Sequence, residues 1–230
     1  MLEVPQLVII DLDDTLYDYS IANRAGEKAL NEFIASVLNQ NSSDIAAELS
    51  KARITLKSRL GEVAASHSRL LYVREFLNSK HIQIHASFAL ECEQVFWREY
   101  LLSSSLFPGV IEFLTYLRLR KTQLVLVTDL TTSIQLRKLA WFGLDKFFDL
   151  VLTSEEAGGD KKSGLPEDLL HKLLVPTPER IWSIGDKDWD HLYKGNSTFF
   201  RKIPTGRFRS VAPDNYEFES YVDLLNQIAD

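Results

Sequence analysis

Cysteine is nearly absent from this sequence, since Cys92 is the only one in 230 residues. A single cysteine excludes an internal disulfide framework and fits a protein of a reducing compartment. Long apolar runs are absent too. The first run, residues 7–10, is far too short for a signal peptide or a membrane span, and no longer run follows it. We therefore expect a cytoplasmic protein with no membrane association, in which Cys92 is a buried helix residue.

Basic residues are fewer than acidic ones. The 26 Lys and Arg against 32 Asp and Glu give a formal net charge of -6. A general nucleic-acid binder needs a basic surface that displaces counterions from phosphates, so we expect no nucleic-acid partner. The net charge does not exclude small anionic substrates, because a local pocket can be positive on an acidic protein. The hydrophobic share of 45% and the charged share of 25% are those of an ordinary globular protein with a substantial core.

Four short apolar runs predict the strands of a parallel sheet. They lie at residues 7–10, 124–127, 150–152 and 181–184, and each is followed by or ends in Asp, Thr, Ser or Gly. Runs without polar interruption are typical of strands that are covered on both faces. Helical patterns at residues 110–117, 134–142 and 169–174 alternate with them. The sequence therefore predicts an α/β fold with a doubly wound, mainly parallel Rossmann-like sheet, whose ligands bind at the carboxyl ends of the strands.

The interval between the first two strands breaks this alternation and is helical almost throughout. Apolar stripes at helical spacing cover residues 30–38, 45–63, 70–77 and 88–100. This pattern predicts an inserted α-helical cap domain over residues 18–105, with an α/β core domain made of residues 1–17 and 106–230. A helical bundle inserted after the first strand is suited to exclude water from a reaction at the edge of the sheet.

Asp11 and Asp13 stand two residues apart, where the first strand opens into a loop. An ionised aspartate can attack phosphorus and form an aspartyl-phosphate. Because its charge repels a phosphate dianion, the site needs a cation, and Mg2+ bound by oxygen atoms is the natural choice. Asp13 is then placed to protonate the leaving oxygen and to activate water afterwards. The structural alternative is that these acidic residues only end a strand and begin a turn.

The ends of the other three strands carry side chains that suit the same chemistry. Thr128 follows the second strand and can donate its hydroxyl to a phosphate oxygen. Lys161 or Lys162, after the third strand, supplies an ammonium for the phosphoryl group. Each residue alone has an ordinary structural explanation, but their order along the chain favours one phosphate site. The fourth strand is followed by three further carboxylates suited to magnesium, those of Asp186, Asp188 and Asp190.

Four segments, DLDDTL, LVLVTD, the lysine loop and IGDKDWD, resemble the motifs of the haloacid dehalogenase-like superfamily, and the resemblance covers nearly the whole chain. It implies the phosphatase branch with a helical cap inserted after the first motif. By this resemblance Asp11 is the nucleophile and a metal ligand, and Asp13 is the general acid and base and gives its main-chain carbonyl to magnesium. The other implied roles are phosphate binding by Thr128, Asp129 and Lys161, metal binding by Asp186, and acidic support by Asp190.

By the same resemblance, Asp13 counts against dehalogenation as the reaction. The dehalogenases of the superfamily generally lack an acid at this position, whereas its phosphatases use one. Three features depart from the usual motifs, and one of them is a segment between Asp190 and Gly195 that is longer than is common. Asp129 stands where relatives often have Asn, and Lys162 replaces the usual Pro after the motif lysine. The choice of Lys161 over Lys162 rests on its seven-residue offset from Ser154.

Several other functions remain compatible with the sequence. A phospho-accepting receiver domain uses similar strand-end residues, but the helical insertion counts against it. A phosphomutase of the same superfamily and a catalytically silent binding protein on this fold remain as alternatives. The expected partner is a small phosphorylated metabolite, which the sequence does not identify further, and neither does it fix the oligomeric state.

Overall fold

The computed structural model describes residues 2–82, 86–174, 178–194 and 197–228. The chain folds into two compact units. The first, the core unit, contains Met1–Asp18 and Ser105–Asp230, and the second, the cap unit, contains Tyr19–Ser104. Within the described residues, no helix is both long and apolar enough to cross a membrane.

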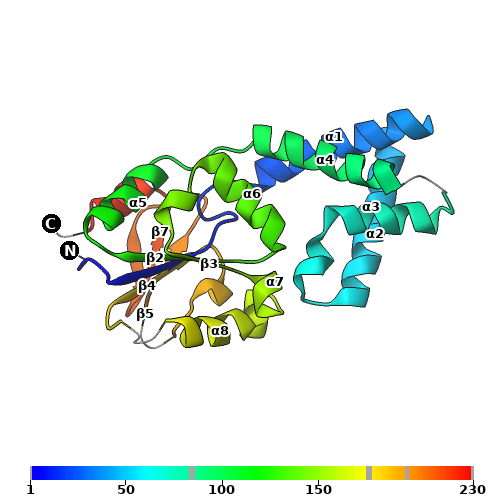
Figure 1. Ribbon diagram of the computed structural model, residues 1–230. Helices are drawn as coiled ribbons and strands as arrows, with labels where there is room; N and C mark the ends of the chain where they lie inside the picture. Colours follow the sequence, from blue (N-terminus) through cyan, green and yellow to red (C-terminus); the bar gives the residue numbers. More distant parts are fainter. Residues whose placement is uncertain (1, 83–85, 175–177, 195–196, 229–230) are drawn as a thin grey trace. The chain divides into compact units, whose positions relative to one another are not determined.

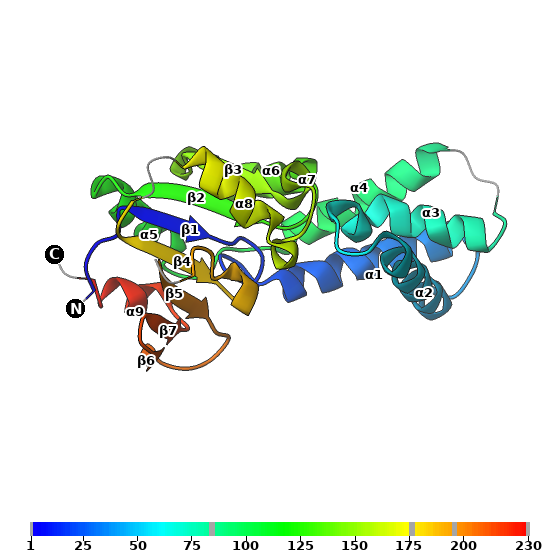
Figure 2. The ribbon, with the colours of Figure 1, turned by 90° about the horizontal axis from the view of Figure 1, so that it is seen from below.

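The core unit is built on a single sheet, which within the described residues has seven strands in the order β3-β2-β1-β4-β5-β7-β6. All neighbouring pairs are parallel except β6 and β7. The view in Figure 2 shows β1 between β2 and β4 in the middle of the sheet. The predicted fold class is thereby confirmed. The strands are β1 (Leu7–Ile10), β2 (Gln123–Thr128), β3 (Leu150–Thr153), β4 (Ile181–Gly185), β5 (Ser197–Lys202), β6 (Arg209–Ala212) and β7 (Asn215–Phe218).

Helices cover both faces of this sheet. Figure 1 shows α5 and α9 on one face and α8 on the opposite face. The core helices are α5 (Val110–Leu119), α6 (Thr132–Phe142), α7 (Ser154–Ala157), α8 (Leu165–Leu173) and α9 (Tyr221–Leu225), with the short 3-10 turns η2 (Asp145–Phe147), η3 (Lys161–Ser163) and η4 (Asp188–Asp190).

The apolar run of β1 is continuous because both of its faces are buried. All four residues have at most 2% of their surface exposed. Side chains alternate across a strand, so Leu7 and Ile9 pack with Leu170 of α8 in one cluster, while Val8 and Ile10 face the other layer. The strand ends where this run ends, at Asp11. The central position of β1 in the sheet thus places Asp11 in the middle of its carboxyl edge.

The chain leaves the core unit and returns to it at two adjacent segments. Tyr17 forms an antiparallel bridge with Leu106. Next to this bridge, the N–H of Phe107 donates to the carbonyl of Leu16 at 2.9 Å. Both segments belong to the core unit, so the junction with the cap is closed by main-chain hydrogen bonds of the core itself.

The cap unit is a helical bundle with an aromatic interior. Its elements are α1 (Tyr19–Leu38), α2 (Ser42–Leu60), η1 (Ala64–His67), α3 (Arg69–Ser79) and α4 (Ala86–Leu102). Phe96, Trp97 and Tyr100 of α4 pack on one another, and Tyr19 of α1 packs on Tyr100 with ring centroids 5.9 Å apart. Aromatic pairs at such distances add to the stabilisation from burial.

Cys92 and Arg69 lie within this interior. Cys92 of α4 is fully buried, as expected from the sequence, and burial raises the pKa of its thiol to about 12. Arg69 is 6% exposed, lies 4.7 Å from the ring centroid of Phe96, and donates to the Tyr19 hydroxyl and the Asn23 side-chain carbonyl at 2.8 and 2.7 Å. The aromatic faces and neutral acceptors stabilise the terminal nitrogen atoms of this buried cation, whereas its Nε has no hydrogen-bond partner among the described residues.

Candidate active site

The functional side chains expected from the sequence lie at the carboxyl edge of the sheet. In the register of the sheet, Ile10 at the end of β1 pairs with Leu126 of β2 and with Ile184 of β4. The N–H of Asp11 then donates to the Ile184 carbonyl at 2.9 Å. This register brings the loops after β1, β2 and β4 to the same edge, where a doubly wound sheet binds its ligands.

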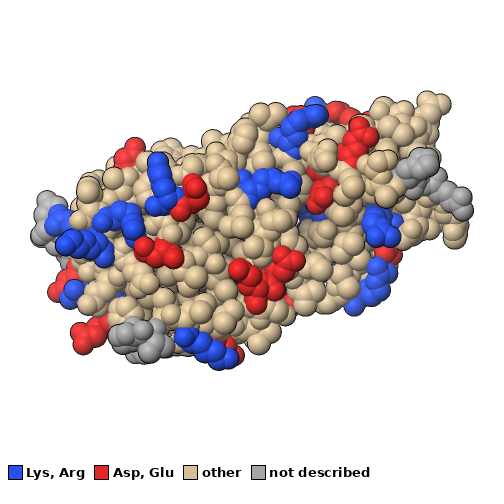
Figure 3. Space-filling view, viewed as in Figure 1, with Lys and Arg blue, Asp and Glu red and all other residues tan. Residues whose placement is uncertain are grey.

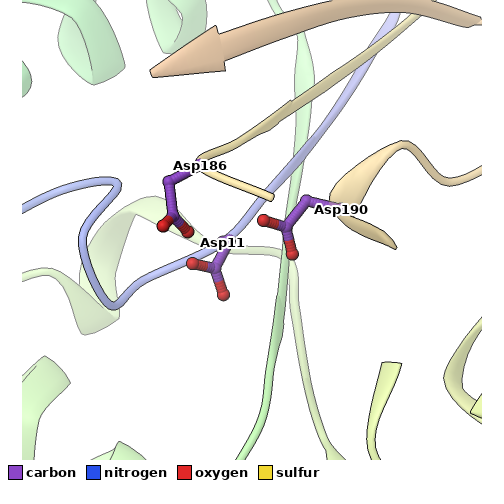
Figure 4. Close-up of side chains that lie close together, drawn as sticks. All are labelled: Asp11, Asp186 and Asp190. Atoms are coloured by element: carbon purple, nitrogen blue, oxygen red, sulfur yellow. The ribbon is translucent and has the colours of Figure 1, made fainter. Parts of the chain in front are cut away.

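Three carboxylates converge at this edge. Asp11 follows β1, Asp186 follows β4 and Asp190 lies in η4. One oxygen atom of each lies within 4.8 Å of the others. Figure 4 shows the three side chains close together. Carboxylate oxygens are the ligands of hard divalent cations such as Mg2+, so this donor set fits the predicted metal. The sequence prediction treated Asp190 only as a supporting residue, whereas its carboxylate is a full member of this cluster.

Gly185 permits the close approach of Asp190. A Cβ atom on Gly185 would collide with the side chain of Asp190, so any other residue would displace one of the two. The turn is also tied by the N–H of Lys187, which donates to the Asp190 carboxylate at 2.9 Å. By contrast, Asp188 points away, is 82% exposed and pairs with Arg201, so it does not belong to the cluster.

Lys161, rather than Lys162, reaches the carboxylate cluster. The Lys161 ammonium lies 2.5 Å from Asp11 Oδ1 and also pairs with Asp190, and only 6% of Lys161 is exposed. Lys162 is exposed, with its ammonium 5.1 Å from the ring centroid of Trp189. The N–H of Lys161 donates to Asp129 Oδ1 at 2.8 Å, so the Asp129 side chain holds the turn that carries Lys161.

The electrostatics of the cluster call for additional positive charge. Burial raises the pKa of Asp11 well above its ordinary value, Asp190 and Asp13 add to this effect, and Lys161 opposes it. Burial alone would lower the pKa of Lys161, but Asp11 and Asp190 outweigh burial and raise it. Burial also raises the pKa of Asp186. The ammonium groups of Lys161 and Lys187, which pair with Asp11 and Asp186, do not cancel this effect of burial, and a divalent cation at the cluster would favour the ionised carboxylates.

Asp13 is held by a different set of groups. The Lys138 ammonium lies 2.7 and 2.9 Å from its two carboxylate oxygens, and the Tyr17 hydroxyl also donates to it. Gln135 donates to Thr128 Oγ1 at 2.8 Å, to the Asp129 carbonyl, and to Asp13 at 3.3 Å. Sequence reasoning missed Gln135 and Lys138. The sequence did offer one indication. The two residues are three positions apart in α6, so they lie on one face of the helix, and each is next to an apolar residue that faces the core.

The comparisons with known proteins agree with this geometry. A family model for haloacid dehalogenase-like hydrolases matches residues 5–192. The chain belongs to this family. It is also 37% identical over 180 residues to the ribulose-1,5-bisphosphate 5-phosphatase of Halopiger xanaduensis, a match that covers 78% of this chain and 75% of the relative. The predicted enzyme class, a phosphatase of this family, is confirmed by these two matches.

Solved structures of the family share the fold. The HAD hydrolase YfnB of Bacillus subtilis, solved with bound magnesium, has a TM-score of 0.67 at 17% identity and covers 96% of this chain and 97% of its own. A 2-haloacid dehalogenase of Pseudomonas syringae also has a TM-score of 0.67, at 19% identity and with the same coverage. At these identities the likeness establishes the α/β core with its cap and says nothing of the reaction.

Proposed function

We propose that this protein is a magnesium-dependent phosphohydrolase that cleaves a small phosphate monoester through an aspartyl-phosphate on Asp11. The observation that carries the proposal is the placement of Asp11 between the Lys161 ammonium and the carboxylates of Asp186 and Asp190. A buried ammonium among buried carboxylates offsets their mutual repulsion, and it is also a group that binds phosphoryl oxygens. A site for a phosphoryl group and a divalent cation needs both charges side by side.

Asp11, Asp186 and Asp190 would hold the magnesium ion, with the main-chain carbonyl of Asp13 as the ligand that the family resemblance implies. When bound, magnesium offsets the negative charge of the carboxylates and polarises the phosphoryl oxygens. The remaining chemistry belongs to the side chains. Thr15 donates to Asp11 Oδ2 at 3.1 Å and Lys161 contacts Oδ1, so the nucleophile is held at both of its oxygens.

The reaction would proceed in two transfers. In the first, a carboxylate oxygen of Asp11 bonds to phosphorus, the ester P–O bond breaks, and Asp13 gives its proton to the leaving oxygen. In the second, Asp13 takes a proton from water, the water oxygen bonds to phosphorus, and the bond between phosphorus and the Asp11 oxygen breaks, which regenerates the Asp11 carboxylate and releases inorganic phosphate. Lys161 and the Thr128 hydroxyl would bind the phosphoryl oxygens during both transfers.

The substrate class proposed here is that of small sugar phosphates. It is supported by the 37% identical relative, whose name specifies a ribulose bisphosphate. The face seen in Figure 3 carries Lys and Arg interspersed with Asp and Glu, without a continuous basic surface that would suit a nucleic acid. The net charge of -6 and the phosphatase relative likewise favour a small metabolite as the partner.

A screen of phosphate monoesters tests this function. Sugar phosphates, sugar bisphosphates and nucleoside monophosphates are incubated with the full chain, with magnesium or with a chelator, and released inorganic phosphate is measured. We expect release from at least one sugar phosphate, with magnesium only. Conversion of a substrate to an isomer without phosphate release would point to a phosphomutase instead, and no reaction with any compound would contradict catalysis on this class.

The identity of the cation gives a further prediction. Chelation should abolish turnover, and added magnesium should restore it, whereas calcium should not. Calcium has longer bonds to oxygen and a looser coordination shell, which would displace Asp11 from its line of attack. The measurement is the steady-state rate of the chelated protein titrated with each cation. Equal rates with both cations would argue against a compact octahedral site at Asp11, Asp186 and Asp190.

A further inference from the structure

Lys138 is an unusual residue for the interior of this fold. Its side chain has no exposed surface, although it lies in α6 and carries an ammonium. Removing such a group from water is costly unless it is paired with good geometry, and an apolar side chain would avoid that cost. The Lys138 ammonium is bonded to both carboxylate oxygens of Asp13, at 2.7 and 2.9 Å. This contact restricts rotation of the carboxyl group about its own axis.

Gln135 lies on the same face of α6, one turn earlier, and is also fully buried. Its amide nitrogen bonds Thr128 and the Asp129 carbonyl at the end of β2, as well as Asp13. Tyr17 adds its hydroxyl to Asp13 from the loop after β1. Helix α6 therefore ties the loop that carries Asp13 to the end of the neighbouring strand, through side chains rather than main-chain bonds.

We propose that Lys138 is the positioning residue for the Asp13 carboxyl group, with Gln135 and Tyr17 as its partners in this role. The inference rests on the proposed function, because it assumes that Asp13 exchanges protons with the leaving oxygen and with water. In this role Lys138 acts on the reaction only through the orientation of Asp13, whose two carboxylate oxygens its ammonium contacts. A misplacement of a reacting group by about 1 Å can cost on the order of a hundredfold in rate.

Substrates with different leaving groups can distinguish a positioning role of Lys138 from a purely structural one. An alkyl phosphate needs a proton from Asp13 as its P–O bond breaks, whereas p-nitrophenolate leaves without one. Loss of Lys138 should therefore slow the first transfer from an alkyl phosphate and spare the first transfer from p-nitrophenyl phosphate. The second transfer uses Asp13 as a base with either substrate. It should be slow in both cases, so p-nitrophenyl phosphate should give a burst of p-nitrophenolate.

The experiment compares Lys138→Met with the parent in rapid-mixing assays with magnesium. The substrates are p-nitrophenyl phosphate and the best alkyl phosphate of the screen. Arg137→Met is the matched control, because Arg137 is exposed on the same helix and adjacent in sequence. We expect about a hundredfold loss with the alkyl phosphate, in kcat more than in KM, and a burst rate with p-nitrophenyl phosphate within about threefold of the parent. Arg137→Met should match the parent throughout.

The Lys138→Met variant should fold. Asp13 keeps its contacts with Tyr17 and Gln135, and its side chain is 22% exposed, so water can reach the carboxylate.

If Lys138→Met melts without cooperativity, Tyr17→Phe is the second variant. It removes a single hydroxyl and should give the same pattern more weakly. Equal losses of the first transfer with both substrates, or no loss with either, would overturn the proposal. A parent without magnesium-dependent turnover would instead overturn the proposed function, so the two failures are distinguishable.

Discussion

Replacing Asp11 with Asn should lower turnover by at least about a thousandfold, on the scale seen when an enzyme loses its nucleophile. The amide has almost the shape of the carboxylate but neither its charge nor its nucleophilicity, so no aspartyl-phosphate can form. The measurement is phosphate release from the best substrate of the screen, together with acid-stable labelling of the chain by substrate phosphate. Parent-like hydrolysis by Asp11→Asn would exclude Asp11 as the nucleophile.

The same substitution should leave the fold intact and give a melting temperature equal to or above that of the parent without metal. Because the pKa of Asp11 is raised in the folded state, the folded chain binds this proton more tightly than the unfolded chain. Ionisation of Asp11 thus lowers stability as the pH rises from its ordinary pKa of 3.8 through the raised value. The neutral amide removes that effect. A markedly lower melting temperature at neutral pH would contradict this account of the Asp11 environment.

Lys161→Met should lower the rate on the order of a hundredfold or more, whereas Lys162→Met should cost far less. The ammonium of Lys161 contacts Asp11 and Asp190, and losing one such electrostatic contact in a closed site has an effect of this size. Lys162 is exposed beside Trp189, where a cation contributes little. Rates of both variants on the best substrate, with magnesium, give the comparison.

Stability has to be measured alongside these rates. Lys161→Met leaves buried Asp11 and Asp190 without their ammonium, and breaking a buried pair costs on the order of 3–5 kcal/mol. The rates should therefore be compared well below the melting temperature of the less stable variant. Asp11→Asn combined with Lys161→Met should recover part of the lost stability, because one uncompensated charge is removed. If Lys162→Met is the crippled variant, the motif lysine is the next residue; if neither is, this turn does not act on the phosphoryl group.

The central strands could be predicted from the sequence because burial on both faces leaves a continuous apolar run. This signal persists in β3 at one edge of the sheet and weakens toward the other edge, beyond β4. β5 contains Phe199 and Phe200 between polar residues, and every residue of β6 is exposed, so neither strand carries an apolar run of the central kind. Their pairing depends on main-chain hydrogen bonds, which leave little trace in side-chain pattern. The sequence prediction therefore ended at β4 and missed β5, β6 and β7.

Some residues of the candidate site could be identified from the sequence, and others could not. Residues that directly follow an apolar strand, such as Asp11, Thr128 and Asp186, could be identified because the strand end itself marks them. Lys138 and Gln135 have no such marker, because their burial arises from packing of α6 against loops that are distant in sequence. The choice between Lys161 and Lys162 also needed the structure, since only the fold of the η3 turn decides which of two adjacent lysines points inward.

The main-chain bonds that close the junction at Tyr17 and Leu106 make the cap an exchangeable module. The chain enters and leaves residues 19–104 through neighbouring segments that the core itself holds together, so a short linker could replace that whole stretch with a small entropic cost of loop closure. Asp11, Thr128, Lys161 and Asp186 would all remain on the shortened chain. Insertions of different length can therefore be grafted at this junction without rebuilding the sheet that carries these four side chains.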